Sequence, residues 1–280
     1  MHALVLQSDF GHADGAVCAM YGVAESVDPG LRIHDLTHEI EPYNIWEASY
    51  RLIQAIDYWP EGTVFVSVVD PGVGSNRRSI TAETADGKFI VSPDNGTLTH
   101  ISKLRGLRSV RIIDETVNRL PHSSESYTFN GRDIYAYTGA RLASGTISFE
   151  QVGPEMPLDS VIMLPVQNPV LQDGVIDGTI DVLDIRFGSI WTNIPHDLLR
   201  SAGISYGDRI QVTIRNDIRS LYRNVMTFAR SFSEVYVGEP LAYINSLEYL
   251  AVAINQGSFA KAYNIGTGNS WHISVRKSEY

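Results

Sequence analysis

The sequence predicts an α/β domain followed by a smaller domain made mostly of β-strands. Strand-like and helix-like segments alternate over the first half, which is the pattern of a mostly parallel α/β sheet. Around Val152-Gly153-Pro154 the character changes, and short strands separated by Gly, Asp and Asn turns follow. The chain has 280 residues, of which 44% are hydrophobic, so two domains can each bury a core. We place the boundary near residue 165, giving domains at 1–165 and 166–280.

The first expected elements alternate between strand and helix. Leu4–Leu6 is a short apolar strand, and a helix is expected from about Gly15 because apolar residues then recur at helical spacing. Asp28-Pro29-Gly30 ends that helix, since neither proline nor glycine continues it well. Ile33–Leu36 follows as a second strand and Asn44–Tyr58 as a second helix.

The third strand, Thr63–Val69, is almost wholly apolar, which is typical of a strand buried on both faces of a parallel sheet. Asp86-Gly87 lies between the strand-like segments Ile80–Thr84 and Lys88–Val91 and indicates a β-hairpin. Arg132–Ala143 is expected to form one more helix. The strands expected in the second half are Gly178–Ile185, Ser189–Asn193, Ile210–Ile214, Leu241–Asn245, Leu250–Ile254 and Trp271–Val275. Short strands with such turns suit a small β-barrel or a sandwich.

The composition excludes several classes of partner and site. The net charge is −10 and no dense run of Lys or Arg is present, which disfavours nucleic acid or an anionic membrane as the main partner. Cys18 is the only cysteine, so neither an intrachain disulfide nor a cysteine-based zinc site is expected. None of the 8 histidines belongs to a His-Glu-x-x-His motif. From this single cysteine and these histidines we expect no bound metal. Because no apolar run reaches membrane-spanning length and no signal peptide is evident, we expect a cytoplasmic protein.

Two aspartates directly follow apolar strands. Asp9 comes after the first strand and Asp70 after the third, and ligands of parallel α/β sheets bind at the carboxyl ends of strands. A carboxylate such as Asp9 is suited to accept hydrogen bonds from both hydroxyls of a ribose. A turn or helix-capping role is the alternative for this residue.

The loop after the third strand combines conformational constraint with charge. Proline and two glycines in Asp70-Pro71-Gly72-Val73-Gly74 force a tight loop whose backbone can approach a ligand closely. Arg77 lies seven positions after Asp70, so the two side chains can pair if the loop folds back. Such a pair would hold a water, or it would simply fix the loop.

Further polar segments give weaker signals. Tyr127–Asp133 lies at a helix entrance, where polar groups bind an anion or a water, or cap the helix. Asp184–Asn193 combines an acid, a glycine turn and an aromatic residue. Tyr243–Ser246 and Asn255–Phe259 are polar at strand ends. Aromatic residues in such segments are more often part of the core than of a binding surface.

Taken in order, these segments resemble the S-adenosylmethionine (SAM) hydroxide adenosyltransferase family, which is related to the SAM-dependent chlorinase and fluorinase. The resemblance covers essentially the whole chain. The segments that carry it are Ser8–Gly11 with Asp14, Asp35–Ile40, Phe65–Arg78, Ser92–Gly96, Thr128–Asp133, Phe187–Asn193 and Gly238–Leu241. The family fold is a Rossmann-like α/β domain with a mostly parallel sheet, followed by a C-terminal β-barrel. The resemblance also implies a homotrimer with each site between one subunit's N-terminal domain and a neighbour's C-terminal domain.

The resemblance assigns roles to individual residues. It implies that Asp9 accepts hydrogen bonds from the ribose hydroxyls, and that Asp70 and Arg77 belong to the set that activates the attacking water. The substrate-binding residues that it implies are Asp9, Asp14, Tyr43, Gly131, Asp184, Ser189, Trp191, Tyr243, Ser246, Asn255 and Gln256. Tyr43 would form a wall beside the sugar. The methionine end would lie among Asp14, Asp184, Ser246 and Trp191. Asn255 and Gln256 would lie near the adenine.

One position departs from the family pattern. The usual sequence is Thr-Phe-His-Gly-Arg-Asp, and Asn130 occupies the place of the histidine. Asparagine does not titrate near neutral pH and cannot act as a base, but it can orient a water through hydrogen bonds. Either Asp70 then acts alone, or the reaction is slower, or the role has changed. His122, in the preceding loop, is a candidate substitute, although a loop histidine is usually only solvated.

The expected activity is hydrolysis of SAM to adenosine and methionine, with neither cofactor nor metal. Two alternatives remain open. Chloride could attack the same carbon, since the small Gly131 leaves room for a halide, although the charge of Asp70 opposes a second anion. The loss of the histidine motivates the other alternative, a non-catalytic protein that binds SAM or adenosine.

Overall fold

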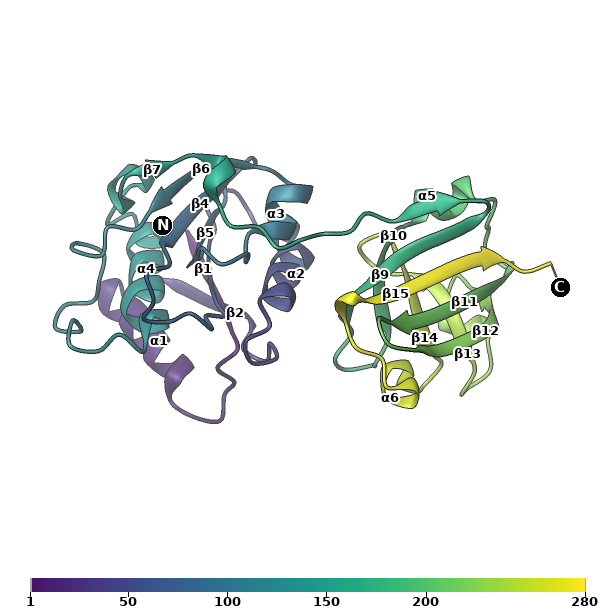
Figure 1. Cartoon of the computed structure of the whole chain (residues 1–280). Coiled ribbons are helices and arrows are strands. Elements are labelled where there is room, and N and C mark those ends of the chain that lie inside the picture. Colours follow the sequence, from purple (N-terminus) through teal and green to yellow (C-terminus); the bar gives the residue numbers. More distant parts are fainter. Residues whose placement is uncertain (1, 280) are drawn as a thin grey trace. The chain divides into compact units, whose positions relative to one another are not determined.

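The computed structural model describes residues 2–279 and divides into two compact units, Met1–Leu164 and Pro165–Tyr280 (Figure 1). Each unit has its own sheet and its own apolar core. The first is a mixed α/β unit and the second a β-barrel, so the predicted fold class is confirmed.

The sheet of the first unit has a parallel part and an antiparallel extension. Its strand order is β2-β1-β3-β5-β4-β6-β7, and the first four strands of that order pair in parallel. The strands are β1 (Ala3–Ser8), β2 (Arg32–Thr37), β3 (Val64–Val68), β4 (Ser79–Thr84), β5 (Phe89–Pro93), β6 (Leu107–Ile112) and β7 (Glu155–Met156). The hairpin expected around Asp86-Gly87 is the β4–β5 pair.

Helices cover both faces of this sheet (Figure 1). They are α1 (Ala16–Val27), α2 (Ile45–Ala55), α3 (Thr99–Leu104) and α4 (Tyr137–Ser144), with 3-10 turns at Ile56–Tyr58, Phe149–Val152 and Leu158–Ser160. Side chains alternate along β1, so that Leu4 and Leu6 pack with α1 and α4 while Val5 packs with α2 and α3. The alternation explains why β1 is apolar on both faces.

The helix expected at Arg132–Ala143 differs from the prediction at its start. Gly131–Ala136 forms a π-helical segment, and α4 continues from it. Wider turns of this kind are rare in proteins, and those that are found lie frequently at functional sites. The apolar spacing of the sequence indicates a helix here but does not distinguish an α-turn from the wider π-turn.

The carboxyl ends of β1 and β3 meet at one edge of the sheet. The two strands are parallel neighbours, and Ser8 lies opposite Val68. Asp9 therefore leaves the sheet beside the segment that leads into Asp70. This register is what brings the two strand-end aspartates into one region.

The second unit is a closed barrel of seven strands with β8 at its side. Its strands are β8 (Val170–Gln172), β9 (Val175–Leu183), β10 (Ile190–Pro195), β11 (Arg209–Asn216), β12 (Ser220–Phe228), β13 (Pro240–Ile244), β14 (Tyr249–Ile254) and β15 (Gly268–Lys277). Its helices are α5 (His196–Ser201) and α6 (Phe259–Tyr263), with a 3-10 turn at Phe232–Glu234. The barrel closes because β10 pairs with both β14 and β9. Of the two β folds that the sequence allowed, the structure adopts the barrel.

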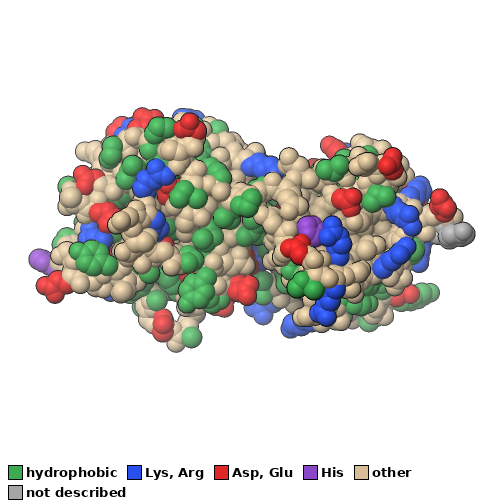
Figure 2. Space-filling model, in the orientation of Figure 1, with side chains coloured by type: hydrophobic (Ala, Val, Ile, Leu, Met, Phe, Trp, Pro, Cys, Tyr) green, Lys and Arg blue, Asp and Glu red, His purple; other side chains and the backbone are tan. Residues whose placement is uncertain are grey.

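Cationic side chains gather on one outer face of the barrel. Lys and Arg side chains are visible over this unit in Figure 2. Four exposed arginines stand on β11, β12 and β15: Arg209, Arg215, Arg223 and Arg276. Over residues 2–279, no helix combines the length and the hydropathy needed to cross a membrane.

Two helical glycines predict opposite effects of the same substitution. A Cβ at Gly139 in α4 would lie 2.4 Å from Val66, whereas a Cβ at Gly22 in α1 would meet nothing within 4 Å. Alanine in an exposed helix is favoured over glycine by about 1 kcal/mol. We expect Gly22→Ala to stabilise the protein by up to that amount, and Gly139→Ala to destabilise it by about 1–3 kcal/mol through overpacking. Urea unfolding of the full chain measures both, and a stabilised Gly139→Ala would contradict the close seating of α4.

Candidate active site

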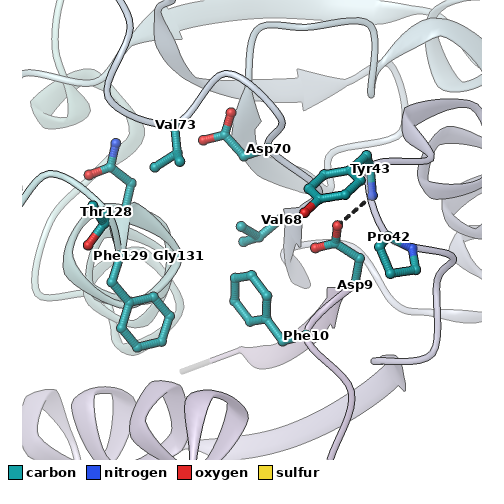
Figure 3. Close-up of a pocket in the computed structure, with 11 residues that line it drawn as sticks. Asp9, Phe10, Pro42, Tyr43, Val68, Asp70, Val73, Thr128, Phe129 and Gly131 are labelled. Carbon is teal, nitrogen blue, oxygen red and sulfur yellow. Dashed lines mark hydrogen bonds between the residues drawn. The ribbon is translucent and has the colours of Figure 1, made fainter.

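A pocket of about 330 Å³ opens at the carboxyl ends of β1 and β3. Such a volume lies in the range of small-molecule sites. Figure 3 shows the side chains of Asp9 and Asp70 bordering this pocket, with Tyr43 beside Asp9. The lining residues are Asp9, Phe10, Pro42, Tyr43, Val68, Asp70, Val73, Thr128, Phe129, Asn130 and Gly131.

Asp70 and Arg77 form a bidentate ion pair. Nε of Arg77 donates to Oδ1 of Asp70 at 2.6 Å, and a second guanidinium nitrogen donates to Oδ2. The loop folds back through backbone turns, in which the Val73 N–H donates to the Asp70 carbonyl at 3.2 Å. The side chain of Asp70 is only 7% exposed, and that of Arg77 is 10% exposed. A carboxylate held at both oxygens has a fixed orientation, so its remaining lone pairs point in set directions.

The surroundings of Arg77 keep this pair charged and in place. Burial, the largest single influence, would lower the pKa of Arg77, but the interactions with Asp70 and Tyr135 together outweigh it and raise that pKa. The guanidinium carbon lies 5.6 Å from the ring centroid of Tyr135, a favourable cation–π contact. Burial raises the pKa of the Tyr135 phenol, which therefore stays neutral. Asp70 thus faces a permanent cation.

The carboxylate of Asp9 is held by a strained backbone. Its Oδ2 accepts a hydrogen bond from the Tyr43 N–H at 2.9 Å. Tyr43 has a φ of 70°, a left-handed conformation that is unfavourable for a bulky residue and that concentrates at functional sites. The next residue, Asn44, caps α2 by accepting from the Glu47 N–H at 3.0 Å. The Tyr43 side chain remains 72% exposed at the pocket rim.

Asn130 and Gly131 close the opposite side of the pocket. Asn130 is 7% exposed, and its Oδ1 is buried without a hydrogen-bond partner among residues 2–279. A Cβ at Gly131 would lie 2.9 Å from the Phe10 ring and 3.3 Å from Val68. The space beside Gly131 is therefore filled by Phe10, whereas the sequence alone left it available to a halide.

The barrel unit carries a second pocket, of about 640 Å³. Its lining residues are Asp184, Arg186, Phe187, Ser189, Phe232, Tyr243, Ile254, Asn255, Gln256, Gly257 and Ser258. Asn255 has a structural task, since its amide donates to the carbonyl oxygens of Phe232 and Val235 at 3.0 and 2.9 Å. Asp184 anchors the following turn, because its carbonyl accepts from the Gly188 N–H at 2.7 Å.

The residues predicted to bind substrate thus divide between two pockets, and three lie outside both linings. Asp14 is exposed and accepts from the Ala16 N–H at the start of α1. Ser246 is exposed in the turn after β13. Trp191 is 8% exposed in β10. His122, proposed as a substitute base, does not line the first pocket either.

Some lining residues were not predicted from the sequence. Phe10, Val73 and Phe129 line the first pocket, and Phe187 and Phe232 line the second. Phe10, Val73 and Phe129 each lie within three positions of a predicted polar residue. Their position as apolar residues beside a polar motif was the sequence signal that could have identified these three as lining residues.

The described part of the chain contains no cluster of three or more His, Cys, Asp and Glu side chains placed to hold a metal ion.

Comparison with known families identifies similarity over both units. A family model described as the SAM hydroxide adenosyltransferase N-terminal domain matches residues 4–153. A second, described as the SAM hydroxide adenosyltransferase C-terminal domain, matches residues 178–272.

Individual relatives bear two kinds of name. The chain is 33% identical to an (R)-S-adenosyl-L-methionine hydrolase of Methanocaldococcus jannaschii over 269 residues, covering 94% of this chain and 92% of that protein. It is 28% identical to a fluorinase of Actinopolyspora mzabensis over 295 aligned residues, covering 97% and 96%. A crystal structure of an uncharacterized conserved protein from Thermotoga maritima superposes with a TM-score of 0.88 at 31% identity, covering 98% of this chain and 99% of that one.

Proposed function

The chain belongs to the SAM hydroxide adenosyltransferase family, and we propose that it hydrolyses SAM to adenosine and L-methionine. The observation that carries this proposal is the bidentate Asp70–Arg77 pair, whose Asp70 lines one pocket together with Asp9. A fixed carboxylate is suited to bind a water. A second carboxylate in the same pocket is suited to hold the ribose that the water attacks.

The reaction is a displacement at the ribose C5′. The water oxygen forms a bond to C5′ while the C5′–S bond breaks, and the electron pair of that bond stays on sulfur. Methionine leaves as a neutral thioether, so the sulfonium needs no further activation by a cofactor or a metal. Asp70 accepts the proton that the water loses, and Arg77 keeps the carboxylate aimed at it. In-line placement of the water supplies much of the acceleration.

The two pockets would receive different parts of the substrate. The ribose would lie in the first pocket, with its hydroxyls on Asp9 and its ring beside Tyr43. The two carboxylates there also favour the sulfonium cation electrostatically. The second pocket supplies the other proposed contacts, which are Asp184, Ser189, Tyr243, Asn255 and Gln256. Asp14, Trp191 and Ser246 would contribute at the methionine end.

Halide attack at the same carbon is disfavoured by two features of the first pocket. Asp70 lines the pocket and Arg77 does not, so a second anion there would meet the carboxylate rather than its compensating cation and would be repelled. Gly131 offers no open space, because the Phe10 ring occupies the position that its missing side chain leaves. Fluorinases are nevertheless among the relatives, so halogenation is the outcome that a halide control must exclude.

We further propose that the working enzyme is a homotrimer in which the first pocket of one copy is completed by the second pocket of another. Each pocket is rimmed by a large exposed aromatic side chain, Tyr43 at 72% exposure and Phe187 at 71%. Exposed aromatic groups at a pocket rim are suited to burial against a partner or a substrate.

The central prediction is that purified protein converts SAM into equal amounts of adenosine and methionine. Asp70→Asn removes the water-binding charge and should lower the rate by about 100-fold or more, the usual effect of losing a general base. Chromatography of reactions with and without chloride measures both products. A 5′-chloro product would favour halogenation instead. Saturable binding with unchanged SAM would show a binding protein.

Restoring the family histidine tests whether Asn130 limits the rate. We expect Asn130→His to raise kcat by about 10-fold or more, because imidazole can accept a proton that asparagine cannot. The same variant should introduce a pH dependence near the histidine pKa. Asn130→Gln is the matched control, since it enlarges the side chain without adding a base. An unchanged rate in Asn130→His would mean that Asp70 suffices.

Shared sites predict complementation between inactive chains. Asp70→Asn impairs only the first pocket and Asp184→Ala only the second, so each variant alone should be weak. In mixed trimers about a quarter of the sites would combine two intact pockets, by the statistics of random assembly. Co-expression should therefore recover roughly that fraction of wild-type activity. Activity no higher than the mean of the two variants would contradict the sharing of sites between copies.

A further inference from the structure

A chain of hydrogen bonds, buried at its inner end and exposed at its outer end, lies beneath the turn that carries Asp9. Ser8 Oγ is 2.7 Å from Nδ1 of His38, and Nε2 of His38 is 3.0 Å from Oδ1 of Asp35. The hydroxyl of Tyr21 in α1 donates to the other oxygen of Asp35. Ser8 is completely buried and His38 is 1% exposed. The chain thus runs from the surface side of α1 to the end of β1.

The direction of every bond in this chain is determined. Asp35 can only accept as a carboxylate, so Nε2 of His38 carries the hydrogen. Nδ1 then accepts from the Ser8 hydroxyl, and Ser8 Oγ in turn accepts from the Phe10 N–H at 3.2 Å. Burial lowers the pKa of His38, and His12 acts in the same direction, while Asp35 and Glu39 oppose them. A neutral imidazole with one fixed tautomer follows.

His38 holds the Asp9 turn at two points. Its side chain binds Ser8 on one side of Asp9, and its carbonyl accepts the Gly11 N–H at 2.7 Å on the other. The register of β1 and β2 contributes to this placement. Leu6 lies opposite Asp35 but Gln7 lies opposite Thr37, so β2 contains one extra residue just before His38. Irregularities of this kind often redirect a side chain near an active site.

We propose that His38 is a positioning residue for Asp9 and acts through Ser8. The inference rests on the proposed function, in which Asp9 binds the ribose hydroxyls. Two hydrogen bonds fix the backbone around Asp9, and the Tyr43 N–H fixes its carboxylate. The sequence of groups matches a Ser-His-Asp triad, but a completely buried Ser8 cannot meet a substrate as a nucleophile.

The same unit contains a matched pair with no link to the pocket. Ser49 Oγ lies 2.9 Å from Nδ1 of His100, and it accepts the His100 backbone N–H at 3.0 Å. Both residues are buried between α2 and α3, and neither lines the first pocket. His100 Nε2 has no partner among residues 2–279, and burial lowers the His100 pKa to about 4. Removing the Ser49 hydroxyl therefore removes a buried serine–histidine hydrogen bond like that of Ser8 and His38, but one that does not position Asp9.

The test is a cycle that couples the protein variant to the ribose hydroxyls of a ligand. Calorimetry on the full chain measures the binding of adenosine and 2′-deoxyadenosine. The wild type should prefer adenosine by about 10-fold, the effect of one hydrogen bond to a charged group. Asp9→Ala should abolish the preference. Ser8→Ala should reduce it at least threefold, and Ser49→Ala should leave it unchanged.

Two further variants separate positioning from general stability. His38→Asn retains an acceptor near the Nδ1 position. This single variant should therefore keep part of the preference for adenosine that the Ser8→Ala variant loses. Tyr21→Phe removes the outer end of the chain from a half-buried position and should reduce the preference by a smaller factor, even if Ser8→Ala does not fold. With SAM as the substrate, these changes should appear in KM more than in kcat.

Each outcome bears on a different claim. The positioning role of His38 is overturned if a folded Ser8→Ala protein keeps the full wild-type preference. If Ser8→Ala does not fold, the same result with Tyr21→Phe overturns it. A wild type without any preference overturns that role together with the ribose contact of Asp9. The hydrolysis of SAM is decided separately by its products. A loss of preference in Ser49→Ala equal to that in Ser8→Ala would assign the effect to stability alone and would also overturn the inference.

Discussion

The parallel pairing of β1 with β2 and β3 determines where the groups of the first pocket lie. Because Ser8 stands opposite Val68, the loops that follow these strands leave the sheet at the same edge. Asp9 and Asp70 then border one pocket although they are far apart in sequence. On the other side of β1, the extra residue in β2 brings His38 under the Asp9 turn. One strand therefore organises both carboxylates and the support beneath one of them.

The two carboxylates are held in different ways, and the difference suits different tasks. Asp70 is locked by a permanent cation at both oxygens, so that its direction is fixed while its charge is compensated. Asp9 receives a single backbone N–H at Oδ2 and depends on the turn around it for its position. A compensated carboxylate is suited to hold a small neutral water. A less encumbered one keeps acceptor capacity for two hydroxyl groups.

Much of this site was predictable because it is local in sequence. Apolar runs predicted the strands before Asp9 and Asp70, and the glycine- and proline-containing loop made the pairing of Asp70 with Arg77 feasible. Long-range packing was not predictable, and the filling of the Gly131 space by Phe10 is the clearest case. Strand β12 was missed because Arg223-Asn224 interrupts its apolar alternation. The π-turn at Gly131 was missed because residue spacing does not encode the width of a turn.

Asn130 shows how a residue without a basic side chain can still serve catalysis in such a pocket. A sulfonium leaves as a neutral thioether, so the barrier depends less on a strong nucleophile than on holding a water in line with the breaking bond. Asn130 is buried at the start of the π-helical segment, where its amide has little freedom to move. Its unpartnered Oδ1 is a costly arrangement unless a bound group compensates for it. A residue that orients without exchanging protons is therefore compatible with catalysis at this position, provided that Asp70 supplies the charge.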